Sequence, residues 1–273
     1  MCCRVNNVHF PLYLIMVQDG HRWGQVVGFA FVKNETEPYI RRIFETLQQA
    51  NPEATSKVQV VLTDKDFVEQ QAVRSVFPCM SLHLCIFHVL RAFSRGISEC
   101  NLTSAQRQNV CEIFEQLVYA DTSTEFDTTV LQLQAYPSAA NYFARCWDGC
   151  KEQWAWCFTK QSLTFGSRTN NIVKSQNQEI KMAQNGKTGF MASIQKLDKV
   201  FALQHDEQMQ RNATAVCKST YVYNSQLPYE FHTRLPVSAV KLLDQQLHKA
   251  QTWVTNGATA DTDDSTQCVQ SRK

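Results

Sequence analysis

The first part of the chain carries two β-like segments followed by an amphipathic helix. Residues 8–17 and 25–32 are rich in β-branched and large apolar side chains, and the turn-forming residues 19–24 separate them. This pattern predicts a β-hairpin. Apolar residues then recur at helical spacing between Glu37 and Asn51, and prolines stand just inside the start and just after the end of this segment, so we expect a helix there.

The next segment repeats the order of strand and helix. Val58–Thr63 is a short β-branched run that ends at Asp64, and the apolar positions from Phe67 to Val76 predict a helix. Ser81–Phe87 is typical of another strand, and we expect a helix from His88 onwards. The predicted order is hairpin, helix, strand, aspartate, helix, strand and helix.

Helical periodicity dominates the rest of the chain. Apolar and aromatic residues recur at helical spacing from 103 to about 160 and predict an all-helical insertion. The residues at 166–171 form a capping turn ahead of a helix at 172–182, and a last amphipathic helix is expected at 237–254. The predicted organisation is a first domain at 1–185, a helical region at 186–255 and a disordered tail at 256–273, which lacks apolar anchors.

Composition and charge describe a globular chain of 273 residues without a strong overall field. Hydrophobic residues make up 44%, and 27 Lys and Arg against 25 Asp and Glu leave a net charge of +2, so nucleic-acid contact would depend on a local patch. The longest apolar run, 10–17, is shorter than the roughly 20 residues of a membrane helix, and we expect no membrane association. Eleven scattered cysteines without a secretory signal predict reduced intracellular thiols.

A strand that ends in an aspartate after a hairpin and a helix is the layout of the ribonuclease H-like fold. In that fold carboxylates converge on two Mg²⁺ ions that cleave or transfer phosphodiesters. Asp64 stands at the position of one such carboxylate. A strand-terminal aspartate is also a common cap for the following helix, so position alone leaves both interpretations open.

The motifs around Asp64 resemble a known family. Val60-Val61-Leu62-Thr63-Asp64, Val76-Phe77-Pro78 and Cys85-Ile86-Phe87-His88 are similar, in order and content, to the domesticated Mutator-like transposase region of SWIM-type zinc-finger proteins. The resemblance covers roughly Val5 to Lys181. It implies an α/β fold: a ribonuclease H-like mixed sheet, here with its first strand missing, an all-helical insertion and a helical C-terminal region.

The resemblance does not carry over the full catalytic set. The family's first aspartate belongs ahead of Val5, where this chain begins, and its last acid belongs at Lys174, where a cation stands instead. Glu179 is five residues further, which places it about 140° around the helix from Lys174. Asp64 is the single retained acid, so we expect a vestigial site, no Mg²⁺ and a degenerate, inactive transposase domain.

Cys85 and His88 form a CxxH pair that could bind zinc. A structural zinc site needs four ligands, and Cys79 and His83 are near in sequence as further partners. The alternative is a buried thiol beside a hydrogen-bonded histidine. The series Cys146, Cys150 and Cys157 lies among bulky apolar residues and is interpreted as core, and the CxC and CxH pairs of a SWIM finger are absent from the tail.

Basic residues suggest a local face for DNA. Arg168, Lys174 and Lys181 lie near the helix that faces DNA in the family, and Arg91 and Arg95 follow the CxxH motif, although solvated helix surfaces would explain them equally well. The leading hypothesis is an inactive nuclear domain that binds nucleic acid or nuclear proteins. The alternatives are an active metal-dependent nuclease or transposase, and a truncated family member with no separate function.

Overall fold

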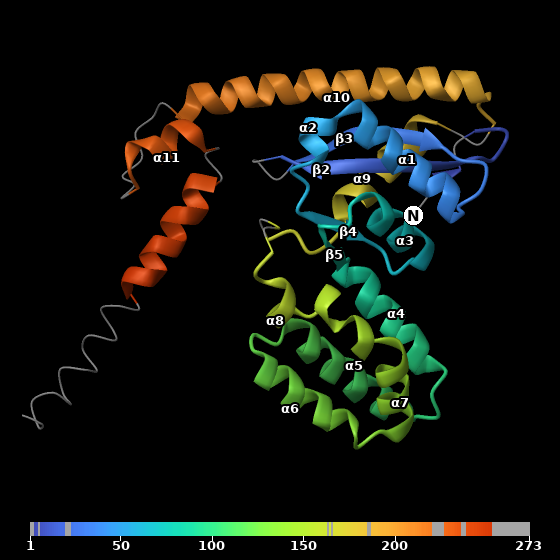
Figure 1. Ribbon diagram of the computed structural model, residues 1–273, viewed down its shortest axis with the longest axis vertical. Coiled ribbons are helices and arrows are strands. Elements are labelled where there is room, and N and C mark those ends of the chain that lie inside the picture. Colours follow the sequence, from blue (N-terminus) through green and yellow to red (C-terminus); the bar gives the residue numbers. More distant parts are fainter. Residues whose placement is uncertain are drawn as a thin grey trace, which may run out of the picture. The chain divides into compact units, whose positions relative to one another are not determined.

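The computed structural model describes residues 3–4, 6–19, 23–162, 164, 166–184, 187–219, 227–235 and 239–252 (Figure 1). The predicted disordered tail at 256–273 lies outside these residues. None of the described helices is both long enough and apolar enough to cross a bilayer.

Three strands at the start of the chain form one sheet. They are β1 (Cys3–Arg4), β2 (Pro11–Gln18) and β3 (Gly24–Phe31), in that spatial order. The backbone N–H of Val32 donates to the carbonyl of Pro11 at 3.0 Å, which closes the base of the predicted hairpin and confirms it. The two-residue β1, which the sequence did not predict, pairs antiparallel with β2.

Two further strands form a separate parallel pair. β4 (Val60–Thr63) pairs with β5 (Ser81–Leu84), with Thr63 opposite Leu84. The resemblance implied a mixed sheet, and the five strands of the described residues form two small sheets.

Helices α1 (Glu37–Ala50) and α3 (Phe67–Val76) pack on each other and on the strands. The short α2 (Pro52–Thr55) follows α1 in the sequence. Phe44 of α1 lies edge-to-face against Tyr13 of β2 and against Phe77, with ring centres 6.0 and 6.1 Å apart. The side chain of Asp66 caps α3 by accepting from two backbone N–H groups. Both predicted helices are confirmed.

The described residues after β5 are helical up to Thr159. They form α4 (Ile86–Ser98), α5 (Ser104–Tyr119), α6 (Ser123–Leu133), α7 (Pro137–Cys146), the 3₁₀ helix η1 (Asp148–Gln153) and α8 (Trp156–Thr159). An aromatic core holds these helices together: Phe93 stacks on Phe114 with ring centres 3.6 Å apart, and Trp147 and Trp154 are at most 1% exposed.

The boundary between β5 and α4 differs from the prediction. The strand expected at Ser81–Phe87 ends at Leu84, and α4 begins at Ile86 rather than at His88. The helices that follow are α9 (Asn171–Ala183), α10 (Phe190–Ser219), α11 (Tyr229–Arg234) and a helix at 239–252.

The chain divides into two compact units. The first contains residues 1–15 and 28–194, and the second contains the hairpin tip, 16–27, together with 195–273. Within the second unit the side chain of Gln208 donates to Asp19 at 2.8 Å, and the guanidinium of Arg211 lies 5.3 Å from the ring centre of Trp23. From the sequence we predicted a domain boundary at 185 and did not predict that the hairpin tip would group with α10. Every residue of the candidate site belongs to the first unit.

Candidate functional site

The carboxyl ends of β4 and β5 place two of the predicted site residues side by side. Because the strands are parallel and Thr63 lies opposite Leu84, the next residues, Asp64 and Cys85, meet at the same edge. The backbone N–H of Cys85 donates to the carbonyl of Thr63 at 2.8 Å and extends the ladder by one bond. In parallel sheets this edge is where ligands usually bind.

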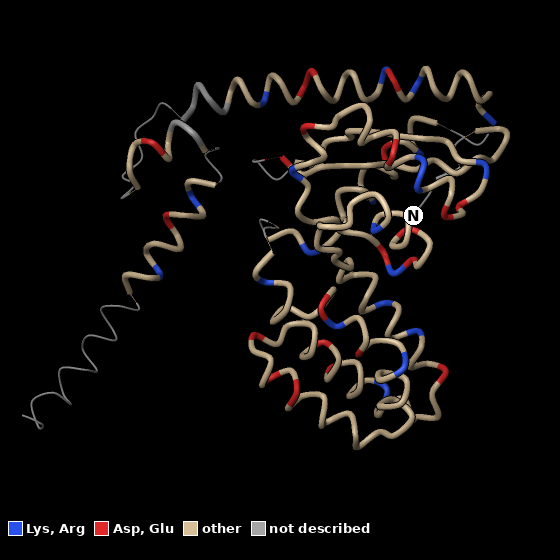
Figure 2. Tube along the Cα trace, in the orientation of Figure 1, with Lys and Arg blue, Asp and Glu red and all other residues tan. Residues whose placement is uncertain are grey.

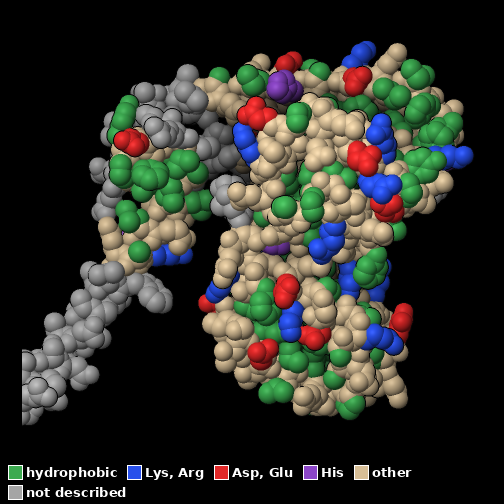
Figure 3. All heavy atoms as spheres, in the orientation of Figure 1, with side chains coloured by type: hydrophobic (Ala, Val, Ile, Leu, Met, Phe, Trp, Pro, Cys, Tyr) green, Lys and Arg blue, Asp and Glu red, His purple; other side chains and the backbone are tan. Residues whose placement is uncertain are grey.

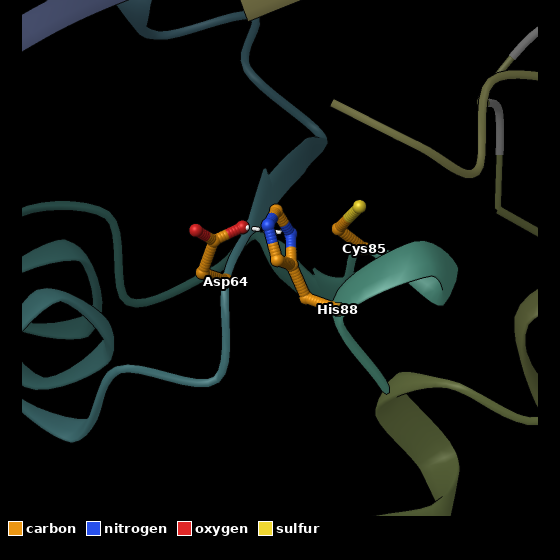
Figure 4. A group of neighbouring side chains, drawn as sticks. All are labelled: Asp64, Cys85 and His88. Carbon is orange, nitrogen blue, oxygen red and sulfur yellow. Dashed lines mark ion pairs between the residues drawn. The ribbon is translucent and has the colours of Figure 1, made fainter. Parts of the chain in front are cut away.

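His88 joins this pair because α4 begins immediately after Cys85. The backbone N–H groups of His88 and Val89 both donate to the carbonyl of Cys85 at 2.9 Å, which forms the first helical turn. A separation of three residues returns the His88 side chain to the same helix face. Figure 4 shows the imidazole between the carboxylate of Asp64 and the thiol of Cys85, and one potential ligand atom from each lies within 4.8 Å of the others.

Asn170 connects the carboxylate to the thiol. Its Nδ2 donates to Asp64 Oδ1 at 2.6 Å, its Oδ1 accepts from the Cys85 thiol at 3.0 Å, and its backbone N–H donates to Cys85 Sγ at 3.3 Å. Asn170 occupies the N-cap position of α9, yet its side chain makes no cap hydrogen bond. The side chain therefore bonds to Asp64 and Cys85 instead of capping α9. A side-chain cap commonly stabilises a helix by about 0.5–2 kcal/mol.

The imidazole of His88 is favoured in its neutral form. Its Nδ1 lies 2.5 Å from Asp64 Oδ1, and 13% of the side chain is exposed. Burial lowers the pKa of His88, and the positive charges of Lys174 and Arg91 lower it further, whereas Asp64 acts in the opposite direction. Nε2 has no hydrogen-bond partner within the described residues.

Lys174 stands in the first turn of α9, close enough to affect His88. Its Nζ lies 3.2 Å from the ring centre of Phe87, is buried, and has no hydrogen-bond partner among the residues that the structure describes. The ammonium is therefore held by the aromatic face and contributes a fixed positive charge to the site.

A cleft of about 480 Å³ opens beside Asp64 and His88. Glu69 of α3 lines it and accepts a hydrogen bond at 2.5 Å from the hydroxyl of Tyr13, which comes from β2. Burial raises the pKa of Glu69, and the Tyr13 hydrogen bond opposes this only in part. Sequence analysis missed Glu69 because an acid in the first turn of a helix is common without any function.

Arg168 is turned toward the helical core rather than toward the cleft. Its Nη2 donates to the carbonyls of Val118 and Trp154 at 3.1 and 3.3 Å, and the guanidinium lies 4.9 Å from the ring centre of Trp156. Burial lowers the pKa of Arg168. Lys181, in the last turn of α9, is exposed.

The other residues considered for metal binding lie elsewhere. Cys79 is exposed, and His83 is buried on β5, where burial and the charge of Arg168 lower its pKa. Cys146, Cys150 and Cys157 pack against the aromatic core of the helical segment. All seven cysteines with described side chains are free thiols.

Comparison with known proteins identifies the first part of the chain. Residues 1–83 match the family described as "Zinc finger SWIM domain-containing protein 1/3, RNaseH-like domain". The match supports a ribonuclease H-like domain similar to that of the SWIM-type proteins in this part of the chain. The match contains β4 and Asp64, whereas Cys85, His88, Asn170 and Lys174 follow it along the chain.

A second similarity is to a much longer protein. Over 238 residues the chain is 24% identical to the "PKS-NRPS hybrid synthetase cheA" of Chaetomium globosum. The match takes up 76% of this chain and spans 5% of the length of that relative. A match to so small a part carries no information on the synthetase's own reaction.

The surroundings of Asp64 do not fit the Mg²⁺ ions that a ribonuclease H-like fold implies. Mg²⁺ requires near-octahedral coordination by oxygen, supplied by carboxylates, carbonyls and water. The imidazole of His88 and the carboxamide of Asn170 contact Asp64 instead, and the thiol of Cys85 is close by. The fixed charge of Lys174 disfavours a second dication.

Proposed function

We propose that the chain is a transposase-derived ribonuclease H-like domain that no longer cleaves nucleic acid and serves as a nuclear binding module. The observation that carries this proposal is the environment of Asp64. Its Oδ1 accepts from Asn170 and contacts His88, and so is engaged within the protein. A cation, Lys174, stands where the resemblance requires an acid.

Glu69 is the additional carboxyl group of the cleft that bears most directly on this proposal. Burial favours its protonated form, and a protonated carboxyl is a poor ligand for Mg²⁺. In addition, the hydroxyl of Tyr13 donates a hydrogen bond to one carboxylate oxygen of Glu69. Glu69 therefore does not replace the lost acid.

DNA is the partner that we propose for the module, through the exposed basic residues beside the cleft. Arg91 and Arg95 are exposed one turn apart on α4, where basic residues can be followed in Figure 2, and Arg95 lines the cleft. Residues four apart share a helix face, so both guanidinium groups can reach one phosphate backbone. Lys181 is a third candidate, whereas the cations of Lys174 and Arg168 are held by aromatic rings.

The test measures cleavage and binding in the same samples. Purified chain with Mg²⁺ or Mn²⁺ should leave single- and double-stranded DNA uncut, because Asp64 alone cannot hold two metal ions. Cleavage that disappears in Asp64→Asn would show an active nuclease and overturn the proposal. Uncut DNA that is also unbound at low salt would leave nuclear proteins as the partners.

A further inference from the structure

The edge formed by β4 and β5 gathers the three donor types that zinc binds. Asp64 offers oxygen, Cys85 sulfur and His88 nitrogen, and within the described part of the chain no other group of three His, Cys, Asp or Glu side chains is so placed. We propose that these three residues bind one Zn²⁺ ion, with water from the adjoining cleft as the fourth ligand. Asp64 and His88 both line that cleft, so water can reach the ion.

The imidazole of His88 has a nitrogen available for the ion. Nδ1 faces Asp64, whereas Nε2 is buried and has no hydrogen-bond partner among the described residues. A buried polar nitrogen without a partner destabilises the folded chain. Coordination through Nε2 would satisfy this nitrogen, and Asp64 would exchange its contact with Nδ1 for a bond to the ion.

Asn170 supplies the supporting contacts that metal ligands usually require. Its backbone N–H points at the sulfur of Cys85, and its Nδ2 holds Asp64 Oδ1. Backbone N–H donors stabilise a thiolate, and a hydrogen-bonded carboxylate keeps its orientation. On binding, the Cys85 thiol loses its proton to solvent, a Zn–S bond forms, and the hydrogen bond from the thiol to Asn170 Oδ1 is lost.

The geometry requires small adjustments and favours zinc over magnesium. A tetrahedral ion with ligands at about 2.0–2.3 Å separates those ligands by about 3.3–3.8 Å. The present span of 4.8 Å therefore closes through side-chain shifts of about 1 Å. Sulfur and nitrogen donors are unsuited to Mg²⁺. The inference stands apart from the proposed function, because loss of cleavage does not require zinc.

Cobalt provides a spectroscopic test on the full chain. The reduced, metal-free protein should take up one Co²⁺ per chain, with tetrahedral visible bands and a thiolate-to-cobalt charge-transfer band, and Zn²⁺ should displace the Co²⁺. Cys85→Ser should abolish the charge-transfer band. His88→Gln and Asp64→Asn should each weaken Co²⁺ binding at least about tenfold. A large excess of Mg²⁺ should not compete.

Matched controls keep the test decisive. Cys79→Ser removes an exposed cysteine close by in sequence and should leave the spectrum unchanged. Because Cys85 is fully buried, circular dichroism must show that Cys85→Ser is folded, and His88→Gln serves as the second ligand variant if it is not. Three results would overturn the inference. The native chain could lack the thiolate-to-cobalt band, folded Cys85→Ser could retain that band, or His88→Gln could bind Co²⁺ with undiminished affinity.

Discussion

Asn170 shows how one side chain can define a site that no short motif reveals. It bonds to Asp64 and Cys85, which lie 106 and 85 positions away in sequence. Sequence analysis could select Asp64, Cys85, His88 and Lys174 from their local motifs. It could not show that Asn170 joins two of them, because that link exists only once α9 is placed against the β4 and β5 edge.

Glu69 provides a prediction at the residue scale. Its pKa is raised in the folded chain, so the folded state binds more protons than the unfolded state, and stability falls as pH rises from the ordinary glutamate pKa through the raised value. Glu69→Gln keeps an acceptor for Tyr13 but carries no charge. We expect this variant to be more stable than the native chain near neutral pH.

Urea denaturation between about pH 5 and pH 8 measures this effect. The lowered pKa values of His83 and His88 raise stability with pH in both proteins, so the difference between them isolates Glu69. Glu53→Gln, at an exposed position, is the control. An identical pH dependence in native chain and Glu69→Gln would contradict the prediction.

Most elements could be predicted from the hydrophobic pattern because their periodicities differ clearly. The hairpin, α1 and α3 are examples. The start of α4 could not be placed, since Cys85, Ile86 and Phe87 continue the apolar run of β5 and an apolar run fits a buried strand or a buried helix start. The division into two sheets was equally hidden, because the periodicity of a segment does not show which strands pair.

The contact between α4 and α7 gives a prediction at the element scale. A Cβ at Gly96 of α4 would lie 2.1 Å from the ring end of Tyr142 on α7, whose hydroxyl donates to the carbonyl of Ala92 at 3.4 Å. Alanine is favoured over glycine in helices by about 1 kcal/mol. We nevertheless expect Gly96→Ala to lower the free energy of unfolding by about 1–3 kcal/mol through overpacking.

A double-mutant cycle checks the cause. In a Tyr142→Ala background the obstacle is gone, so Gly96→Ala should become neutral or stabilising. Gly149→Ala has open space around it and controls for the general effect of losing a glycine. Equal destabilisation by Gly96→Ala in both backgrounds would rule out the Tyr142 contact as the cause.

At the scale of the whole molecule, charge is balanced and locally mixed. The net charge is +2, and basic and acidic side chains are interspersed on the face drawn in Figure 3. The DNA affinity of the proposed function therefore depends on a few phosphate contacts. The balance of charge could be predicted from composition. The grouping of the hairpin tip with α10 could be found only from the structure.

The salt dependence of DNA binding follows from that small number of contacts. Each phosphate contact contributes about 0.9 to the slope of log K against log salt, so Arg91, Arg95 and Lys181 together predict a slope of about −3. Arg95→Ala should make the slope shallower by about 0.9. Fluorescence anisotropy with labelled duplex DNA measures this.

Arg41→Ala is the matched control, because that guanidinium already pairs with Glu37 and Glu45 on α1. It should leave the slope unchanged. A slope that does not respond to Arg95→Ala, or that responds equally to Arg41→Ala, would place the DNA contacts elsewhere.

Arg168 makes the candidate site inseparable from the helical core. Its carbonyl accepts from the N–H of Ile86 at the start of α4, while its guanidinium is bonded to Val118 and Trp154. A fragment carrying β4, β5 and α4 alone would therefore lose one of the anchors that set the direction of α4. The consequence is evolutionary as much as structural: a lineage that discarded the helical insertion would discard the site's geometry with it, so the two are inherited together.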